Sequence, residues 1–310
     1  MSNLPRAGVG NICYWDRWTK FSMEAVSENM RIMDDEASKN PIYEPQFAFN
    51  TSIECRRLIL SRYSRGDAVG ELAKHFPKLL SSWEYSDRLA AEVCRKHGLK
   101  TCRDWAFSLR DMNHYNWCFC LVGLALALDI PEDQWLRLLT LIGGEGADEL
   151  LDRVIASRHP SRQIGTELLH IRPYARLLKA VDAPSEQQAS QLLDFVDHWY
   201  VELERKGNQR LWWYDYGDPI KNPLEMGSYF GRWCIEAVAA VKAFGIDDTG
   251  CLDHPHYPGD LIQDGRSPRY PDPVPTTGTD MSQIEFGSAT HGRPARNWLS
   301  RLLLGPDRHR

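Results

Sequence analysis

The stretch from Gly227 to Gly245 constrains the fold more than any other part of this sequence. Its apolar residues recur at steps of four and three, which is the spacing of one face of an α-helix. They are Phe230, Cys234, Ala237, Val241 and Phe244. The small alanines of this stretch would let a neighbouring helix approach closely, and Gly245 would end the helix. We therefore predict a buried helix at the centre of a helical fold.

The same period recurs along most of the chain, whereas no alternation typical of a strand extends beyond four residues. The predicted helical ranges are about 17–36, 45–65, 79–96, 104–128, 131–143, 147–157, 167–180 and 185–206. Asp67 is expected to cap the helix after Gly66, and Ser185 to Gln188 resembles a capping box. The sequence thus predicts an all-α protein, a multi-helix bundle with an extended, Pro-rich C-terminal tail.

Composition along the chain suggests three parts. We predict an N-terminal helical domain at 1–128, a C-terminal helical domain at 129–265 and an extended tail at 266–310. The tail is rich in Pro, Gly, Ser and Thr, with one short helix expected near 295–304. The longest apolar run, 117–128, is too short to span a bilayer, and no secretory signal is evident. Eight scattered Cys residues without a Cys-x-x-Cys pair favour reduced thiols, so we expect a cytoplasmic protein that contacts no membrane.

Charge is unevenly distributed. The whole chain has a net charge of −5, but residues 129–265 carry 13 basic and 23 acidic side chains, a net of −10. This balance argues against direct nucleic-acid binding, which requires Lys and Arg for the phosphates. It suits a basic protein partner through electrostatic steering, although a solvated acidic surface would look the same. The candidate partner-binding residues form two clusters: Glu145, Asp148, Glu149 and Asp152, and then Asp247, Asp248 and Asp253.

Carboxylates and imidazoles also gather between Asp247 and Asp260, where His254 and His256 flank a proline. Such ligands can hold a metal, so a metal-dependent enzyme is the alternative hypothesis. The spacing of the two His residues lacks the i, i+4 pattern of a helical zinc site, and a structural loop is favoured. We predict no catalytic residue, no metal and no cofactor.

Three further features have structural explanations. Cys118 lies in an apolar run, where burial would suppress a thiol nucleophile. Arg232 and Glu236 are spaced to pair on a helix, which would compensate a buried carboxylate. The aromatic cluster from Leu211 to Tyr216 either anchors a loop in the core or offers an exposed anchor to a partner.

Three segments resemble the PoNi family, immunity proteins that neutralise polymorphic nuclease toxins of bacteria. One is Tyr63-Ser64-Arg65-Gly66-Asp67, and another is Leu192-Leu-Asp-Phe-Val-Asp-His-Trp-Tyr200. The third is the central stretch from Gly227 onward, which ends in Tyr257-Pro258-x-Asp260-Leu261. The resemblance covers roughly residues 45–265, but Arg232 stands where family members often continue an aromatic pattern.

The resemblance implies paired helical domains and an inhibitor with no enzymatic activity. It also implies a partner, a secreted nuclease toxin, commonly a DNase, delivered by a contact-dependent system such as type VI secretion. The protein would bind this toxin in the cytoplasm of the producing cell and block its active site or DNA groove.

Overall fold

A computed structural model describes residues 4–35 and 40–271, and every regular element in these ranges is helical. The prediction of an all-α fold is therefore confirmed for this part of the chain, while the predicted extended tail and its short helix lie outside the described residues. The principal helices are α1 (Ile12–Asp34), α2 (Glu44–Arg65), α3 (Val69–Leu72), α4 (Phe76–His97), α5 (Met112–Ala127), α6 (Glu132–Ile142), α7 (Glu149–Ala156), α8 (Ile171–Asp182), α9 (Ser185–Glu202) and α10 (Ile235–Phe244).

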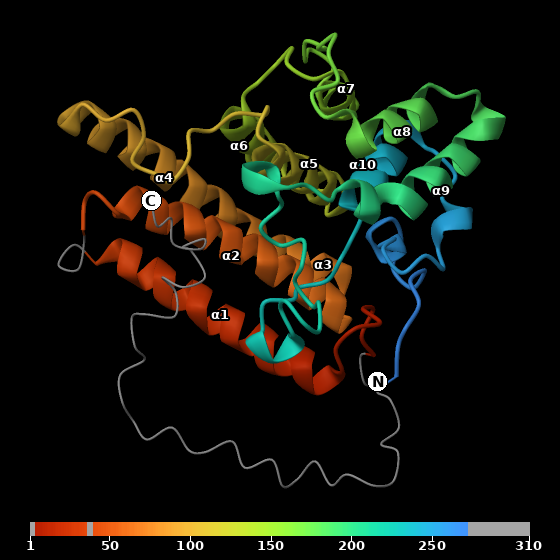
Figure 1. Cartoon of the computed structure of the whole chain (residues 1–310), viewed down its shortest axis with the longest axis horizontal. Helices are drawn as coiled ribbons and strands as arrows, with labels where there is room; N and C mark the ends of the chain where they lie inside the picture. The colour runs from red at the N-terminus through yellow and green to blue at the C-terminus, as the bar shows by residue number, and fades with distance from the viewer. Residues whose placement is uncertain (1–3, 36–39, 272–310) are drawn as a thin grey trace, which may run out of the picture. The chain divides into compact units, whose positions relative to one another are not determined.

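The helices pack in two groups. The long helices α1, α2 and α4 lie side by side in one layer, and α8 and α9 form a hairpin (Figure 1). Between them, α5 packs along α10. The described residues form one compact unit. The predicted domain boundary at residue 128 falls inside this unit and stays a prediction.

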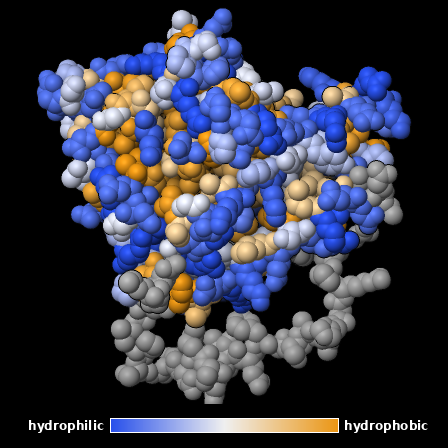
Figure 2. All heavy atoms as spheres, turned by 180° about the vertical axis from the view of Figure 1, so that it is seen from behind, coloured by the Kyte–Doolittle hydropathy of each residue, from blue (hydrophilic) through white to orange (hydrophobic). Residues whose placement is uncertain are grey.

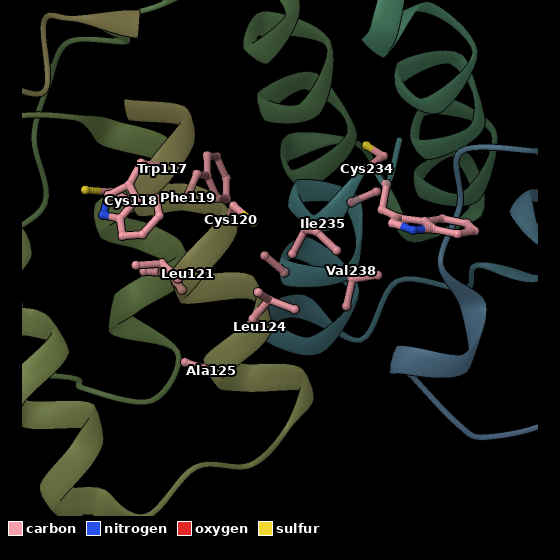
Figure 3. Packing of buried hydrophobic residues seen from close by; sticks show 14 of the residues in the cluster. Trp117, Cys118, Phe119, Cys120, Leu121, Leu124, Ala125, Cys234, Ile235 and Val238 are labelled. Carbon is pink, nitrogen blue, oxygen red and sulfur yellow. The ribbon is translucent and has the colours of Figure 1, made fainter. Parts of the chain in front are cut away.

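The α5–α10 pair forms the centre of the core, as the apolar patterns of both segments predicted. Most of α5 is buried, and Leu124 lies on the side of α5 that faces Ile235 and Val238 of α10, whereas Cys118 and Leu121 lie on the other side (Figure 3). Gly123 makes this close approach possible, because a Cβ there would lie 2.7 Å from Cγ2 and 2.8 Å from the carbonyl oxygen of Ile235. Within the described ranges, no helix combines the length and apolar character that a bilayer crossing requires.

Several predicted boundaries were wrong for local reasons. α5 begins at Met112 rather than Asp104, because Asp111 caps it by accepting hydrogen bonds from Asn113 N and His114 N. α10 begins only at Ile235, so two of the five stripe residues precede the helix. Gly231 explains this start: its φ is +101°, and a Cβ there would lie 2.4 Å from Ser64 Oγ.

Two predicted caps were also wrong. Ser185 is the first residue of α9 and makes no capping hydrogen bond, so the capping box does not form. Asp67 does not cap α3. Its carboxylate instead accepts hydrogen bonds from Arg62 and Arg65 at the end of α2. The guanidinium groups of Arg62 and Arg65 therefore take the place of the backbone N–H groups that Asp67 was predicted to cap.

Candidate partner-binding site

The first acidic cluster is divided between the interior and the surface. Asp148 and Asp152 are each only 1% exposed, whereas Glu145 is exposed and Glu149 is partly exposed. Asp148 caps α7 by accepting from Leu151 N at 2.8 Å, and it also accepts from Tyr115 Oη at 2.9 Å and Leu169 N at 2.8 Å. These two candidate partner-binding residues are therefore buried rather than on the surface.

Asp152 holds the loop around α7 in place. Its Oδ1 lies 2.7 Å from Nε of the buried Arg162, and its Oδ2 accepts from the backbone N–H groups of Gly146, Asp148 and Gly165. Glu145 accepts from Gln163 N at 2.7 Å, and Glu149 lies 3.4 Å from Arg153. Only the two glutamates therefore offer charge that a partner could reach.

The second cluster is divided in the same way. Asp248 is 4% exposed and accepts two hydrogen bonds from the guanidinium of Arg266 and one from Tyr257 Oη. Asp247 is exposed and accepts from both the backbone N and Oγ1 of Thr249, and Asp253 is exposed. Asp247 and Asp253 thus remain available to solvent, while Asp248 organises the loop, contrary to its expected place on a solvated surface.

Asp260, in the motif that ends the family resemblance, binds the N-terminal segment through Arg6. Its Oδ2 lies 2.5 Å from Nε of Arg6 and 2.6 Å from Nη2 of Arg269. Arg6 also donates to the carbonyl oxygens of Tyr63 and Asp67. Burial alone would raise the pKa of Asp260, but the hydrogen bonds from Ser267, Arg6 and Arg269 lower it below its usual value. The motif therefore joins the two ends of the described chain.

The segments that carry the family resemblance meet in the interior. Ser64 donates to the carbonyl oxygen of Phe230 and accepts from Trp233 Nε1 at 2.8 Å. Tyr63 packs edge-on against Trp233, with ring centroids 5.0 Å apart, and its hydroxyl lies 3.0 Å from Ser267 Oγ. These motifs hold the fold together, so they do not themselves define a contact surface.

The predicted pair of Arg232 with Glu236 does not form. Arg232 donates to the carbonyl oxygen of Tyr216 and stacks on Tyr200, because it precedes α10 and points away from the helix. Glu236 is 1% exposed and accepts from Asn116 and Tyr174 instead. Its structural role is as predicted, but its partners were not.

The loop from Asp247 to Asp260 does not assemble a metal site. Within the described residues, no group of three or more His, Cys, Asp or Glu side chains is placed to hold an ion. Asp248 and Asp260 bind arginines, and His256 Nδ1 lies 3.1 Å from the carbonyl oxygen of Arg232. Burial lowers the pKa of His256 to about 4, so the imidazole is neutral at pH 7. Asp248, Asp260 and His256, which the metal-enzyme hypothesis would use as ligands, instead make structural contacts.

The aromatic cluster is divided between the core and the surface. Leu211 and Trp213 are buried, and Trp213 Nε1 donates to Asn116 Oδ1 at 3.1 Å. Trp212 is 37% exposed and, with Tyr216, borders a surface hollow of about 630 Å³. The cluster thus anchors a loop in the core and presents one indole to solvent. Seen from behind the view of Figure 1, apolar residues gather in the upper left among hydrophilic ones (Figure 2).

The contacts of two buried arginines, Arg6 and Arg56, could not be predicted from the sequence. Arg6 lies in a segment without a periodic pattern, and its partner Asp260 is 254 residues away. Arg56 lies on α2 beside the predicted apolar face and is 2% exposed, stacked on Trp117 with the guanidinium carbon 4.6 Å from the ring centroid. An arginine within an amphipathic helix normally extends to water, so no local signal identifies either residue.

Comparison with known proteins defines the class of this chain. Residues 146–261 match the family model described as PoNe immunity proteins (PoNi), C-terminal. The crystal structure of protein PA2201 from Pseudomonas aeruginosa has a similar fold, with a TM-score of 0.64 and 20% identity over 86% of this chain and 92% of that chain. None of the curated proteins matches.

The matched domain is that of an immunity protein, which is not an enzyme. Residues 146–261 are thus similar to the C-terminal domain of PoNe immunity proteins, a family whose role is neutralisation of a PoNe toxin. The match lies within the predicted C-terminal domain and does not reach Tyr63–Asp67. The resemblance in the first helices therefore stays a prediction.

Proposed function

We propose that this protein binds a cognate secreted nuclease toxin in the cytoplasm of the producing cell and blocks it by occupying its active site or DNA groove. The match of residues 146–261 to the PoNi family carries this proposal. The resemblance of the motifs to immunity proteins against nucleases supports a DNase as the target. The charge of −10 over residues 129–265 fits a basic, DNA-binding partner.

Within this proposal, the exposed carboxylates form the rim of the interface. These are Glu145, Glu149, Asp247 and Asp253. Asp148, Asp152 and Asp248 support the same surfaces indirectly, since each fixes the loop that presents an exposed neighbour. Rim charges accelerate association and contribute less to the lifetime of a complex.

A partly exposed aromatic residue is the usual centre of such an interface, and Trp212 is the candidate. Its indole borders the hollow that Tyr216 also lines, and the adjacent Trp213 fixes the loop from within. Truncation of Trp212 should weaken binding, whereas Val201→Ala, at an exposed position on α9, is the matched control.

The test is co-expression with the toxin encoded beside this gene, followed by purification of the complex and a DNA-cleavage assay. We expect protection of the cells, a stoichiometric complex and loss of cleavage as the immunity protein is titrated in. A catalytically inactive toxin should bind equally well. Protection without a detectable complex would contradict inhibition by binding, and cleavage of RNA alone would contradict the DNase assignment.

A further inference from the structure

A buried arginine in α2 has donors that no residue satisfies. Arg56 is 2% exposed, and its Nε and Nη2 have no hydrogen-bond partner in the part of the chain that the structure describes. The guanidinium lies between two indoles, 4.6 Å from the ring centroid of Trp117 and 5.5 Å from that of Trp212. Aromatic faces attract a cation but cannot accept its in-plane N–H groups. A buried guanidinium requires an acceptor as well.

Across the same interior, Glu236 has acceptor capacity to spare. Its Oε1 accepts from Asn116 Nδ2 at 2.9 Å and from Tyr174 Oη at 3.0 Å. A carboxylate has about four acceptor positions on its two oxygens. Trp199 is close enough to Glu236 to lower the pKa of its carboxyl by hydrogen bonding, yet among the described residues no acceptor lies in full hydrogen-bond geometry to Trp199 Nε1. Three N–H donors and a partly used carboxylate therefore surround the same space.

That space is a small internal cavity. Its volume is about 20 Å³, and it is lined by Arg56, Asn116, Cys120, Trp199 and Glu236 among other residues, all of them buried. A polar cavity of roughly 10–15 Å³ or more can hold one water molecule, provided that two to four polar groups surround it. Both conditions are met here.

We propose that this cavity is the binding site of a single ordered water molecule, which accepts from Arg56 and Trp199 and donates to Glu236. Water fits better than an ion. An anion would lie beside the carboxylate of Glu236, a cation would lie beside the guanidinium of Arg56, and the volume admits only a water-sized ligand. The bridge would connect α2, outside the family match, with α10, inside it.

The bridge gives the buried charges a joint role. Burial raises the pKa of Glu236 and lowers that of Arg56, which means that burial disfavours the charged form of each group. A water that contacts both lets each charge compensate the other across the cavity. The stability of the N-terminal helices and of the matched domain is then coupled at this point, independently of any toxin.

The experiment is a high-resolution crystal structure of the full chain, combined with NMR detection of water near indole N–H groups. We expect density for one water within hydrogen-bonding distance of Arg56, Glu236 and Trp199, and a water cross-peak at Trp199 Nε1–H. Trp135 is the internal control, because its Nε1 is also buried and unpartnered but lies outside the cavity lining. Its N–H should show no such peak.

Variants provide a second measurement. Arg56→Met and Glu236→Gln should each lower the melting temperature, and the double variant should lose less than the sum of the two. Arg57→Met, one position along α2 and outside the cavity lining, should leave the water in place. If the single variants do not fold, Trp199→Phe keeps an aromatic side chain but removes the indole N–H, and it should weaken the water density. A direct Arg56–Glu236 contact, ion density in the cavity or equal cross-peaks at Trp199 and Trp135 would each overturn the proposal.

Discussion

Asp148 beside α7 and Asp260 at the end of the loop from Asp247 to Asp260 are both buried carboxylates, but their hydrogen-bond donors differ. Each lies in a loop that also carries acidic side chains exposed to water. Asp148 is satisfied by neutral groups only, two backbone N–H groups and a tyrosine hydroxyl. Asp260 is satisfied by two arginines as well as the backbone of Ser267. Burial of a carboxylate thus does not by itself require an ion pair, but where an ion pair forms, its loss leaves a second charge behind.

The largest effect is expected for Asp152→Lys. The new cation would lie beside the buried Arg162 and face three backbone N–H groups, so the free energy of unfolding should fall by about 5 kcal/mol. Urea denaturation measures this loss. Glu149→Lys, on the same helix, is the matched control, and it should change stability by less than about 1 kcal/mol because its contact with Arg153 is near the surface.

Asp260→Asn should follow, with a loss of about 3–5 kcal/mol, because Arg6 would lose its buried counter-charge and keep only its contact with the exposed Asp264. The pKa of Asp260 in the folded protein lies below the ordinary value of 3.8. Its contribution is therefore fully present above about pH 4 and is lost as the pH falls through the lowered pKa. Unfolding of both proteins at several pH values should show the gap between them narrowing only below pH 4. A constant gap would contradict a stabilising charge at this site.

Asp148→Asn should cost less, about 1–3 kcal/mol, since it disturbs hydrogen bonds to neutral donors and strands no opposite charge. Thermal and urea unfolding side by side with Asp260→Asn give the comparison directly. Equal losses of unfolding free energy for the two variants would show that the charge of the donors does not distinguish Asp148 from Asp260.

The smallest effect on stability is expected at the surface. Reversal of Glu145, Glu149, Asp247 and Asp253 to Lys should leave the protein folded, with a total change of about 1–2 kcal/mol. Association with the toxin should slow, and the difference should shrink at high ionic strength. Association kinetics at two salt concentrations test this. An unchanged rate would move the interface away from these residues.

The sequence by itself determined the helical class and the centre of the core. The spacing of the stripe in the central stretch predicted a buried face, and four of its five residues are buried: Phe230, Cys234, Ala237 and Val241. Apolar periodicity reports burial reliably because the hydrophobic effect acts on each residue through its own surface area. The family motifs could also be recognised from the sequence, because each is a short run of neighbouring residues.

Only the tertiary structure decided which charges are buried and which partners they have. Asp148 and Glu149 are neighbours in the sequence, yet the first is a buried cap and the second reaches the surface. Asp260 depends on Arg6, 254 positions away, and Glu236 depends on Asn116, 120 positions away. A polar side chain is buried only where distant donors or acceptors satisfy it, and those partners come from elements whose proximity no local pattern encodes. The periodic pattern therefore determined where the helices form, whereas long-range packing determined which carboxylates are buried and which partners they have.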